Sequence, residues 1–306
     1  MNTQLATATQ IYRPRSTKKD RRSKTDISVL KSEIYKLLEA EQPMTIRHCF
    51  YRLVSSGVLD KTEAEYKGTL IRLLGKMRRN GEIPFHWLVD STRWVRQIKT
   101  YDSLTEMAED CKRTYRRALW RAQPVYVEVW CEKDTIATIL SEVTAQFNVP
   151  LMIARGFSSI TFIYGAAEII KSQNKPTHIL YFGDHDPSGK SISAVLERDL
   201  RDFSDGADIT FTRLAITEQQ IIDLNLPTRP TKKTDSRAKN FVGESVEVDA
   251  LSASNLKVLV NNAIVELINP DAYWTVKAAE DSERETLDFW AAVLKKTEDD
   301  DLEDDV

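Results

Sequence analysis

The segment that most constrains the fold runs over residues 179–189 and reads Ile-Leu-Tyr-Phe-Gly-Asp-His-Asp-Pro-Ser-Gly. Its apolar first part is typical of a buried strand, and the glycine that follows ends the run. Because side chains alternate along an extended chain, Asp184 and Asp186 are expected to point the same way just after the strand. Open α/β sheets bind ligands at this carboxyl edge, so the segment predicts an α/β domain with two acids at its ligand-binding edge.

The two acids predict half of a metal site. Like charges held close together repel unless a cation lies between them, and Mg²⁺ prefers carboxylate oxygens together with substrate phosphates. A Walker A phosphate loop is the first alternative, but it requires a glycine five positions before Gly189, where this chain has Asp184. A plain surface turn is the second, since Asp-Pro-Ser-Gly is also common turn chemistry. His185 should point the opposite way and is interpreted as a neighbour, not a ligand.

A second acid follows another β-rich run about fifty residues earlier. Residues 125–134 read Val-Tyr-Val-Glu-Val-Trp-Cys-Glu-Lys-Asp, and the apolar residues after them have helical spacing. Glu132 lies at the end of this strand, whereas the alternative, Glu128, falls in its middle and would face a covering helix or a domain contact. No zinc-ligand spacing occurs among the histidines and cysteines: His48, His86, His178, Cys49, Cys111 and Cys131.

The N-terminal half predicts three short helices. Helical periodicity covers residues 27–40 and 45–54, and a third helix is expected to start at Asp60, with Glu63 completing a capping box, and to stop at Asn80. Residues 83–89 then have the composition of a β wing. Three helices and a wing indicate a winged-helix DNA-binding module. Its candidate DNA contacts are Arg47, Arg52, Lys67, Arg72, Lys76, Arg78 and Arg79.

Together these motifs resemble a known family. A glutamate after one strand and Asp-x-Asp after a later one resemble a Toprim domain. A winged helix before it, with an arginine four residues before the tyrosine of the pair Phe50 and Tyr51, resembles the A subunit of topoisomerase VI and its meiotic double-strand-break relative. Residues 244–251 are similar to the family's late strand, which leads into a helix. The resemblance covers about residues 25–267.

The resemblance implies a DNA-cleaving transesterase. Tyr51 would attack double-stranded DNA and form a 5′-phosphotyrosyl link, with Arg47 as the family's arginine. Glu132, Asp184 and Asp186 would bind Mg²⁺, or Mn²⁺ in its place. The protein would be a homodimer in which the tyrosine of one subunit meets the metal site of the other.

The chain departs from the family in three ways. It is shorter than a usual A subunit, residues 154–159 follow the family pattern only loosely, and nothing resembles the ATP-binding B subunit, so such an ATPase partner is not identifiable. The compact size is similar to that of the orphan Mini-A proteins associated with mobile elements. These departures put topoisomerase activity in doubt and leave DNA cleavage as the expectation.

The chemistry of Tyr51 is compatible with this role. A tyrosine hydroxyl, with a pKa near 10, is a poor nucleophile until a neighbour favours the phenolate. Arg47 lies one helical turn earlier on the same face and is expected to stabilise both the phenolate and the attacked phosphate. Packing in a helical core is the competing interpretation, and Cys49 is interpreted as a small buried hydrophobe. The other candidate tyrosines lack an arginine four positions upstream: Tyr35, Tyr66 and Tyr115.

Two other functions compete with the transesterase. In a hydrolytic Toprim nuclease, water would attack the phosphodiester and Tyr51 would only pack or contact DNA. In a non-catalytic DNA-binding regulator, the three acids would serve structure alone. A covalent bond between protein and DNA distinguishes the three hypotheses.

The two halves of the chain differ in charge. Residues 1–122 carry 25 Lys and Arg against 14 Asp and Glu, and the rest carries 18 against 32, which places the nucleic-acid contacts in the first half. We expect a basic disordered arm over residues 1–25, a winged-helix domain over 26–122, a Toprim domain with a C-terminal elaboration over 123–295 and an acidic tail over 296–306. Residues 228–239 form a second basic loop. Each of the two basic segments is equally compatible with a solvated linker and with a segment that contacts DNA.

The composition is that of a protein with two cores and no membrane segment. No run approaches the length of a membrane span, and the first residues lack the apolar centre of a secretion signal. Three cysteines without a pairing pattern fit a reducing compartment. The expected location is therefore the cytoplasm, in association with the nucleoid.

Overall fold

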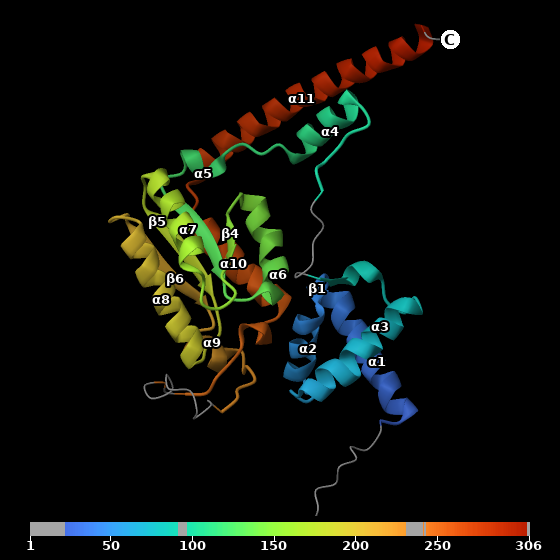
Figure 1. Ribbon diagram of the computed structural model, residues 1–306, viewed down its shortest axis with the longest axis vertical. Coiled ribbons are helices and arrows are strands. Elements are labelled where there is room, and N and C mark those ends of the chain that lie inside the picture. Colours follow the sequence, from blue (N-terminus) through green and yellow to red (C-terminus); the bar gives the residue numbers. More distant parts are fainter. Residues whose placement is uncertain (1–21, 91–96, 231–240, 242, 305–306) are drawn as a thin grey trace, which may run out of the picture.

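The computed structural model describes residues 22–90, 97–230, 241 and 243–304. It is mixed α/β with about 62% helix, as the sequence predicts for the fold class. The described residues form two hydrophobic cores (Figure 1), one among the N-terminal helices and one around a parallel sheet. These two cores meet at the site described below.

The first two N-terminal helices form where the periodicity predicts them. Ser23 begins α1 (Lys24–Glu41) through a capping box with Asp26, and the Thr45 hydroxyl caps α2 (Ile46–Ser55). The chain leaves α2 at Gly57, where φ is +73°, a conformation that glycine adopts without steric cost. Apolar side chains at helical spacing on α1 are buried against α2: Leu30, Ile34 and Leu38.

The third helix starts later than expected. It consists of a π-helical stretch, η1 (Ala64–Ile71), that continues directly into α3 (Arg72–Arg79). The Asp60 capping box is wrong: the Thr62 hydroxyl accepts from the Glu65 N–H at 3.2 Å, because residues 60–62 form a turn in which the Thr62 N–H donates to the Asp60 carbonyl. The end at Asn80 is confirmed.

The expected wing is replaced, within its described residues, by a short parallel pairing. Pro84 precedes a single 3₁₀ turn, η2 (Phe85–Trp87), and β2 (Leu88–Val89) pairs with β1 (Met44–Thr45), Met44 opposite Leu88. Proline has no N–H to donate to a strand ladder, which explains why pairing begins only after it. Residues 91–96, where a wing hairpin would continue, lie outside the described residues.

The second core surrounds a four-stranded parallel sheet. The strands are β3 (Tyr126–Cys131), β4 (Leu151–Ile153), β5 (Thr177–Phe182) and β6 (Ile209–Ala215), in the order β4-β3-β5-β6. On one side α6 (Asp134–Thr144) packs with α10 (Ala253–Leu267), and on the other α7 (Ile160–Gln173) packs with α8 (Pro187–Phe203) (Figure 1). Shorter elements complete it: η3 (Ala145–Phe147), α9 (Glu218–Asp223) and η5 (Val248–Ala250).

The strand order creates a topological switch point between β3 and β5. From β3 the chain moves outward to β4 and then returns to the other side of β3 to form β5. The two strands pair in parallel with Cys131 opposite Phe182, so the residues that follow them, Glu132 and Asp184, lie at neighbouring strand ends. Ligands of open α/β sheets bind in the crevice at such a point.

The last helix joins the two ends of the α/β half. α11 (Pro270–Asp304) packs along α4 (Leu104–Thr114) and contacts α5 (Leu119–Ala122), as Figure 1 shows. The buried residues of the N-terminal core run from Leu30 to Leu88, and α11 continues into the acidic segment. Of the basic arm, residues 1–21 lie outside the described part, and Lys24 already belongs to α1.

No described helix is both long and apolar enough to cross a bilayer.

Replacement of Gly189 by alanine should destabilise the fold. A Cβ at this position would lie 2.2 Å from the Asp184 carbonyl oxygen, so the backbone of α8 or of the strand end must shift. We expect a loss of about 1–3 kcal/mol in the free energy of unfolding, measured by urea denaturation. Gly165→Ala is the matched control, because Gly165 lies within α7 with open space around it and should gain about 0.5–1 kcal/mol. Equal effects in both variants would contradict the packing argument.

Candidate active site at the β3–β5 switch point

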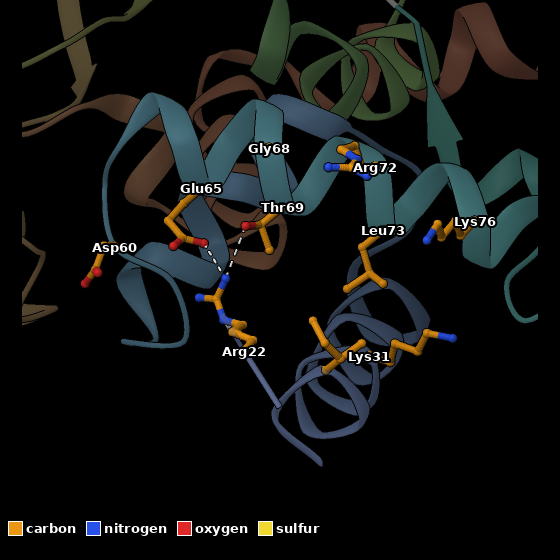
Figure 2. Close-up of a pocket in the computed structure, with 10 residues that line it drawn as sticks. Arg22, Lys31, Asp60, Glu65, Gly68, Thr69, Arg72, Leu73 and Lys76 are labelled. Atoms are coloured by element: carbon orange, nitrogen blue, oxygen red, sulfur yellow. Dashed lines mark hydrogen bonds and ion pairs between the residues drawn. The ribbon is translucent and has the colours of Figure 1, made fainter. Parts of the chain in front are cut away.

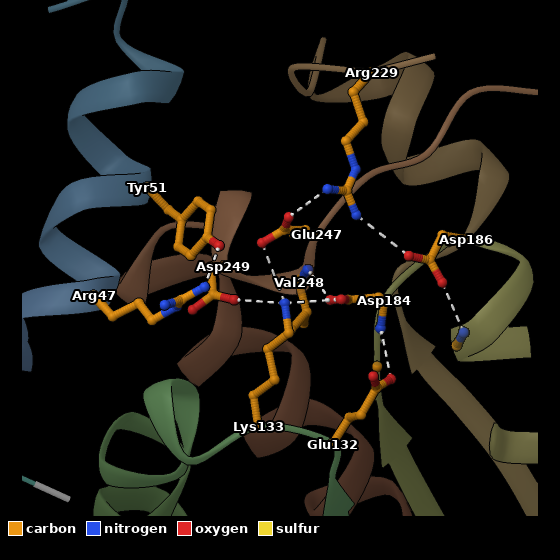
Figure 3. Close-up of polar contacts among 12 residues, drawn as sticks. Arg47, Tyr51, Glu132, Lys133, Asp184, Asp186, Arg229, Glu247, Val248 and Asp249 are labelled. Carbon is orange, nitrogen blue, oxygen red and sulfur yellow. Dashed lines mark hydrogen bonds and ion pairs between the residues drawn. The ribbon is translucent and has the colours of Figure 1, made fainter. Parts of the chain in front are cut away.

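The candidate site lies where α2 of the N-terminal core faces the carboxyl ends of β3 and β5 (Figure 3). Its side chains come from α2, from the two strand ends and from residues 247–249, which precede α10. The sequence-predicted residues Arg47, Tyr51, Glu132, Asp184 and Asp186 all lie in this region.

An ammonium group lies at the centre of the acidic residues. The Lys133 Nζ is 2.8 Å from Asp184 Oδ2, 3.0 Å from Asp249 Oδ2 and 3.3 Å from Glu247 Oε2. Burial disfavours the charged amine, but these carboxylates outweigh it and raise the pKa of Lys133. Burial likewise opposes the ionised form of Asp249, and Lys133 nonetheless holds the pKa of Asp249 below its usual value. Lys133 thus acts as an internal counter-ion for carboxylates from two distant segments.

The two acids of the Asp-x-Asp motif bind different basic side chains. Asp184 is buried and its Oδ1 accepts from the Val248 N–H at 2.8 Å, while Oδ2 faces Lys133. Asp186 caps α8 by accepting from the Gly189 N–H at 2.7 Å, and its other oxygen lies 3.3 Å from Arg229. The two carboxylates therefore have different basic partners, and Asp186, whose backbone is still extended at φ −148° and ψ 172°, is the N-cap of α8.

Glu132, not Glu128, lies at the strand end. Its Oε2 accepts from the Asp184 N–H at 3.2 Å and from the Tyr181 hydroxyl at 3.4 Å. Burial, followed by the charge of Asp184, raises the pKa of Glu132 to about 7. The carboxylate is therefore costly to ionise in this arrangement.

The donor chemistry at this edge fits a hard cation. Glu132, Asp184 and Asp186 offer only carboxylate oxygens. The raised pKa of Glu132 reflects burial first and repulsion from Asp184 second, and a cation would offset both. In the described residues, however, no three acidic, histidine or cysteine side chains are grouped as ligands. Asp184 and Asp186 face Lys133 and Arg229, so binding of Mg²⁺ requires both to exchange partners.

Tyr51 and Arg47 are paired as the helical spacing predicts. The Arg47 Nη2 donates to the Tyr51 hydroxyl at 3.2 Å. The tyrosine ring is 8% exposed, and two ammonium groups lie near it, Lys61 at 4.9 Å and Lys133 at 5.7 Å from the ring centroid. Three cations therefore surround Tyr51, and two of them, Lys61 and Lys133, also contact acids of the α/β domain.

Tyr51 is nevertheless protonated in this arrangement. Burial, followed by its hydrogen bond to the Glu247 carboxylate, raises the pKa of Tyr51 to about 12, although Arg47 and Lys133 act in the opposite direction. Arg47 thus acts on Tyr51 in the expected direction, but burial and Glu247 together outweigh it. Glu247 itself, paired with Lys133 and Lys61, has a pKa of about 2 despite its burial.

Several site residues escape prediction from sequence. Arg213 on β6 donates to the carbonyls of Gly183, Asp184 and Gly189, and it thereby fixes the loop that carries both motif acids. A charged residue inside an alternating apolar strand is a signal that could have identified it. Glu247 and Asp249 repeat the acid-x-acid spacing of the main motif within residues 244–251. That segment forms isolated bridges and a 3₁₀ turn where a strand was expected.

The predicted DNA contacts divide into two groups. Arg52 forms an ion pair with Glu41 at 2.8 Å and donates to the Ala250 carbonyl, so it holds the two cores together. Arg78 is half-buried beside the ring of Phe85. The exposed members are Arg47, Lys67, Arg72, Lys76 and Arg79.

Two of the exposed members line a basic pocket of about 850 Å³ between α1 and the third helix (Figure 2). In this pocket Arg22 binds Glu65 at 2.7 Å, and Lys31, which also lines it, binds Glu82 at 2.6 Å. Arg72 and Lys76 form no ion pair within the described residues. Their positive charge is therefore available to phosphate groups.

Lys133→Met should lower the free energy of unfolding, because it leaves the buried carboxylates without their counter-ion. Removal of one partner of a buried ion pair costs about 3–5 kcal/mol, so we expect a loss of that size at pH 7 in urea unfolding. The pKa values of Glu247 and Asp249 are lowered in the folded state. The stabilisation that these ion pairs give the wild-type protein is therefore present above about pH 4 and is lost as the pH falls toward 2. The difference from wild type should therefore shrink on acidification. Lys112→Met, which removes an exposed pair with Asp288, should stay within about 1 kcal/mol.

Glu128→Gln should change how the free energy of unfolding depends on pH. Glu128 is buried in mid-strand, accepts from Trp130 Nε1 and Tyr126 Oη, and burial raises its pKa to about 7. Between about pH 4.5 and 7 the folded state keeps a proton that the unfolded chain has released, so wild-type stability falls as the pH rises. The variant does not titrate, and its stability relative to wild type should rise by up to about 3 kcal/mol between pH 4.5 and 8. A pH-independent difference would contradict a protonated Glu128.

Comparison of the sequence with protein-family models and with curated proteins gives no match. The features that bear on function are therefore those of the chain itself. They are the acids at the switch point with their lysine counter-ion, the arginine-bound tyrosine that faces them, and the exposed basic residues of the third helix.

Proposed function

We propose that this chain is a Mg²⁺-dependent transesterase that binds and cleaves double-stranded DNA through Tyr51. The observation that carries the proposal is the continuous contact from Arg47 through Tyr51 and Lys133 to Asp184. It brings a candidate nucleophile and a phosphate-binding cation to the ligand-binding edge of an α/β sheet. Tyr51 and Asp184 come from different cores, so the contact is not a by-product of packing within either one.

The fold supports the same proposal at a coarser level. A basic helical half precedes a four-stranded parallel sheet whose two central strands are followed by Glu132 and Asp184. We propose that the first part serves as a winged-helix module and the second as a Toprim domain, as the resemblance to topoisomerase VI A subunits implies. Arg72 and Lys76 would then contact DNA phosphates from the third helix.

The residues of the chain account for the main steps of cleavage. Arg47 would bind the phosphate and hold it beside the hydroxyl to which it already donates. Once Glu247 has exchanged its ion pairs with Lys133 and Lys61, it would take the proton of Tyr51 as the tyrosine oxygen forms a bond to phosphorus. The bond from phosphorus to the 3′ oxygen breaks, and this oxygen takes a proton from water and leaves as a 3′ hydroxyl. Glu132, Asp184 and Asp186 would hold Mg²⁺, which supplies charge neutralisation at the phosphodiester and at the leaving oxygen.

The homodimer remains part of the proposal. The resemblance implies that a tyrosine meets the acids of a second subunit, whereas here Tyr51 lies against Lys133 and Glu247 of its own chain. Contacts between the cores, such as Lys61 with Glu247 at 2.6 Å, would have to be exchanged for equivalent contacts between subunits. Whether Tyr51 meets the acids of its own chain or those of a second subunit, we propose that DNA binds at the junction of the two cores.

A hydrolytic nuclease is the second candidate function. The burial and the raised pKa of Tyr51 favour it, because a protonated, enclosed phenol is a poor nucleophile. In that case water attacks the phosphate, Arg47 binds it, and Tyr51 only packs. A non-catalytic DNA-binding regulator is favoured by the pairing of Asp184 and Asp186 with Lys133 and Arg229, which gives both acids a structural role.

The deciding experiment is trapping of a protein-DNA adduct. Purified protein is incubated with supercoiled or end-labelled duplex DNA and Mg²⁺ or Mn²⁺, stopped with denaturant and separated by gel electrophoresis. We expect DNA covalently linked to wild-type protein and none with Tyr51→Phe or Glu132→Ala, because each removes one group that the bond-making step needs. The loss should exceed about 100-fold in each variant.

Two tyrosine variants serve as matched controls. Tyr66 also lies near Arg47, with the guanidinium 5.6 Å from its ring, and Tyr35 is exposed on α1. Tyr66→Phe and Tyr35→Phe should both retain the adduct. Free cut ends that persist in Tyr51→Phe would establish hydrolysis, and binding without cleavage in every protein would favour the regulator.

A further inference from the structure

A cavity of about 930 Å³ lies between the two cores and opens beside the candidate site. Arg47, Tyr66, Arg78 and Phe85 line it from the N-terminal core. Glu132 and Lys133 are among the residues that line it from the α/β domain. The cavity therefore connects the arginine that binds the Tyr51 hydroxyl with the carboxyl ends of the strands.

Phe85 gives this cavity an exposed aromatic surface. The side chain is 64% exposed, although it follows a proline in a single 3₁₀ turn beside a well-packed core. The Arg78 guanidinium lies 5.3 Å from the centre of its ring. An aromatic ring accompanied by an arginine plane is a surface on which nucleobases stack without sequence preference.

Arginines at two points of the cavity provide positive charge at different distances from the strands. Arg47 reaches the Tyr51 hydroxyl from α2. Arg155 follows β4, where φ is +54°, and it pairs with Asp134 at 3.0 Å with much of its side chain exposed. A non-glycine residue in this conformation is uncommon and carries a conformational cost, and such residues cluster at ligand-binding sites.

We propose that the cavity is a nucleotide subsite that takes an unpaired base of the DNA strand, stacked on Phe85, with the adjoining phosphate at Arg47. The inference rests on the proposed function only in taking DNA as the ligand. The cavity volume lies in the range of about 300–1,000 Å³ typical of small-ligand sites, which accommodates a nucleotide but not a stack of base pairs. The protein therefore favours DNA with a frayed, gapped or displaced strand over fully paired duplex.

The test measures DNA binding in the absence of cleavage. Tyr51→Phe protein is titrated against a fluorescently labelled blunt duplex and against the same duplex with a short single-stranded extension, and anisotropy gives the two dissociation constants. We expect the extension to improve affinity and Phe85→Ala to weaken binding of the extended duplex by about tenfold. Binding of the blunt duplex should change by less than about twofold. Phe85→Tyr, which keeps an aromatic face, should restore the preference.

Phe289→Ala is the matched control, because Phe289 is 63% exposed but lies on α11, away from the cavity. It should leave both dissociation constants unchanged. A second readout is 2-aminopurine in the extension, whose fluorescence should fall on stacking and recover in Phe85→Ala. The subsite would be overturned if Phe85→Ala weakened binding of both DNAs equally or of neither, or if the protein bound no DNA at all. Adduct formation through Tyr51 is scored separately, so failure of one proposal is distinguishable from failure of the other.

Discussion

The buried ion cluster around Lys133 is the interaction on which the junction of the two cores depends. Its carboxylates come from the end of β5 and from residues 247–249, and neither segment could bury them without a cation. The same turn also receives Lys61 from the N-terminal core, so neutralisation of charge and docking of the cores involve the same carboxylates. Arg52 and Glu41 extend this polar contact to the start of α10.

This electrostatic arrangement also sets the resting state of the candidate nucleophile. Tyr51 shares Glu247 with Lys133 and Lys61, and a carboxylate so firmly ionised is a hydrogen-bond acceptor, not a base that removes a phenolic proton. Activation of Tyr51 therefore requires a redistribution of charge at the junction. Binding of a phosphate at Arg47 and of a divalent cation at the strand ends would change the charges around Tyr51 and Glu247, which now keep the tyrosine protonated.

The sequence predicts those parts of the molecule that depend on local spacing. The apolar runs before Glu132 and Gly183 form the two central strands, and the four-residue spacing of Arg47 and Tyr51 places both groups in contact. What it does not predict is the identity of the counter-ion, because Lys133 meets acids that lie 114 and 116 residues later in the chain. The partner of Asp186, Arg229, is equally hidden from the sequence, because it lies 43 residues later in the chain. The start of the third helix differs from the prediction for a local reason, since Asp60 and Thr62 are both good caps and the turn over residues 60–62 leaves Thr62 in the capping position.

The pairing of α4 with α11 has a consequence for the order in which the molecule assembles during synthesis. All residues of the N-terminal core precede residue 89, so this core is complete in sequence before any strand of the sheet is made. By contrast, Lys112 on α4 meets Asp288 on α11 across 176 residues. A nascent chain therefore carries α4 without its partner until residues 270–304 have left the ribosome.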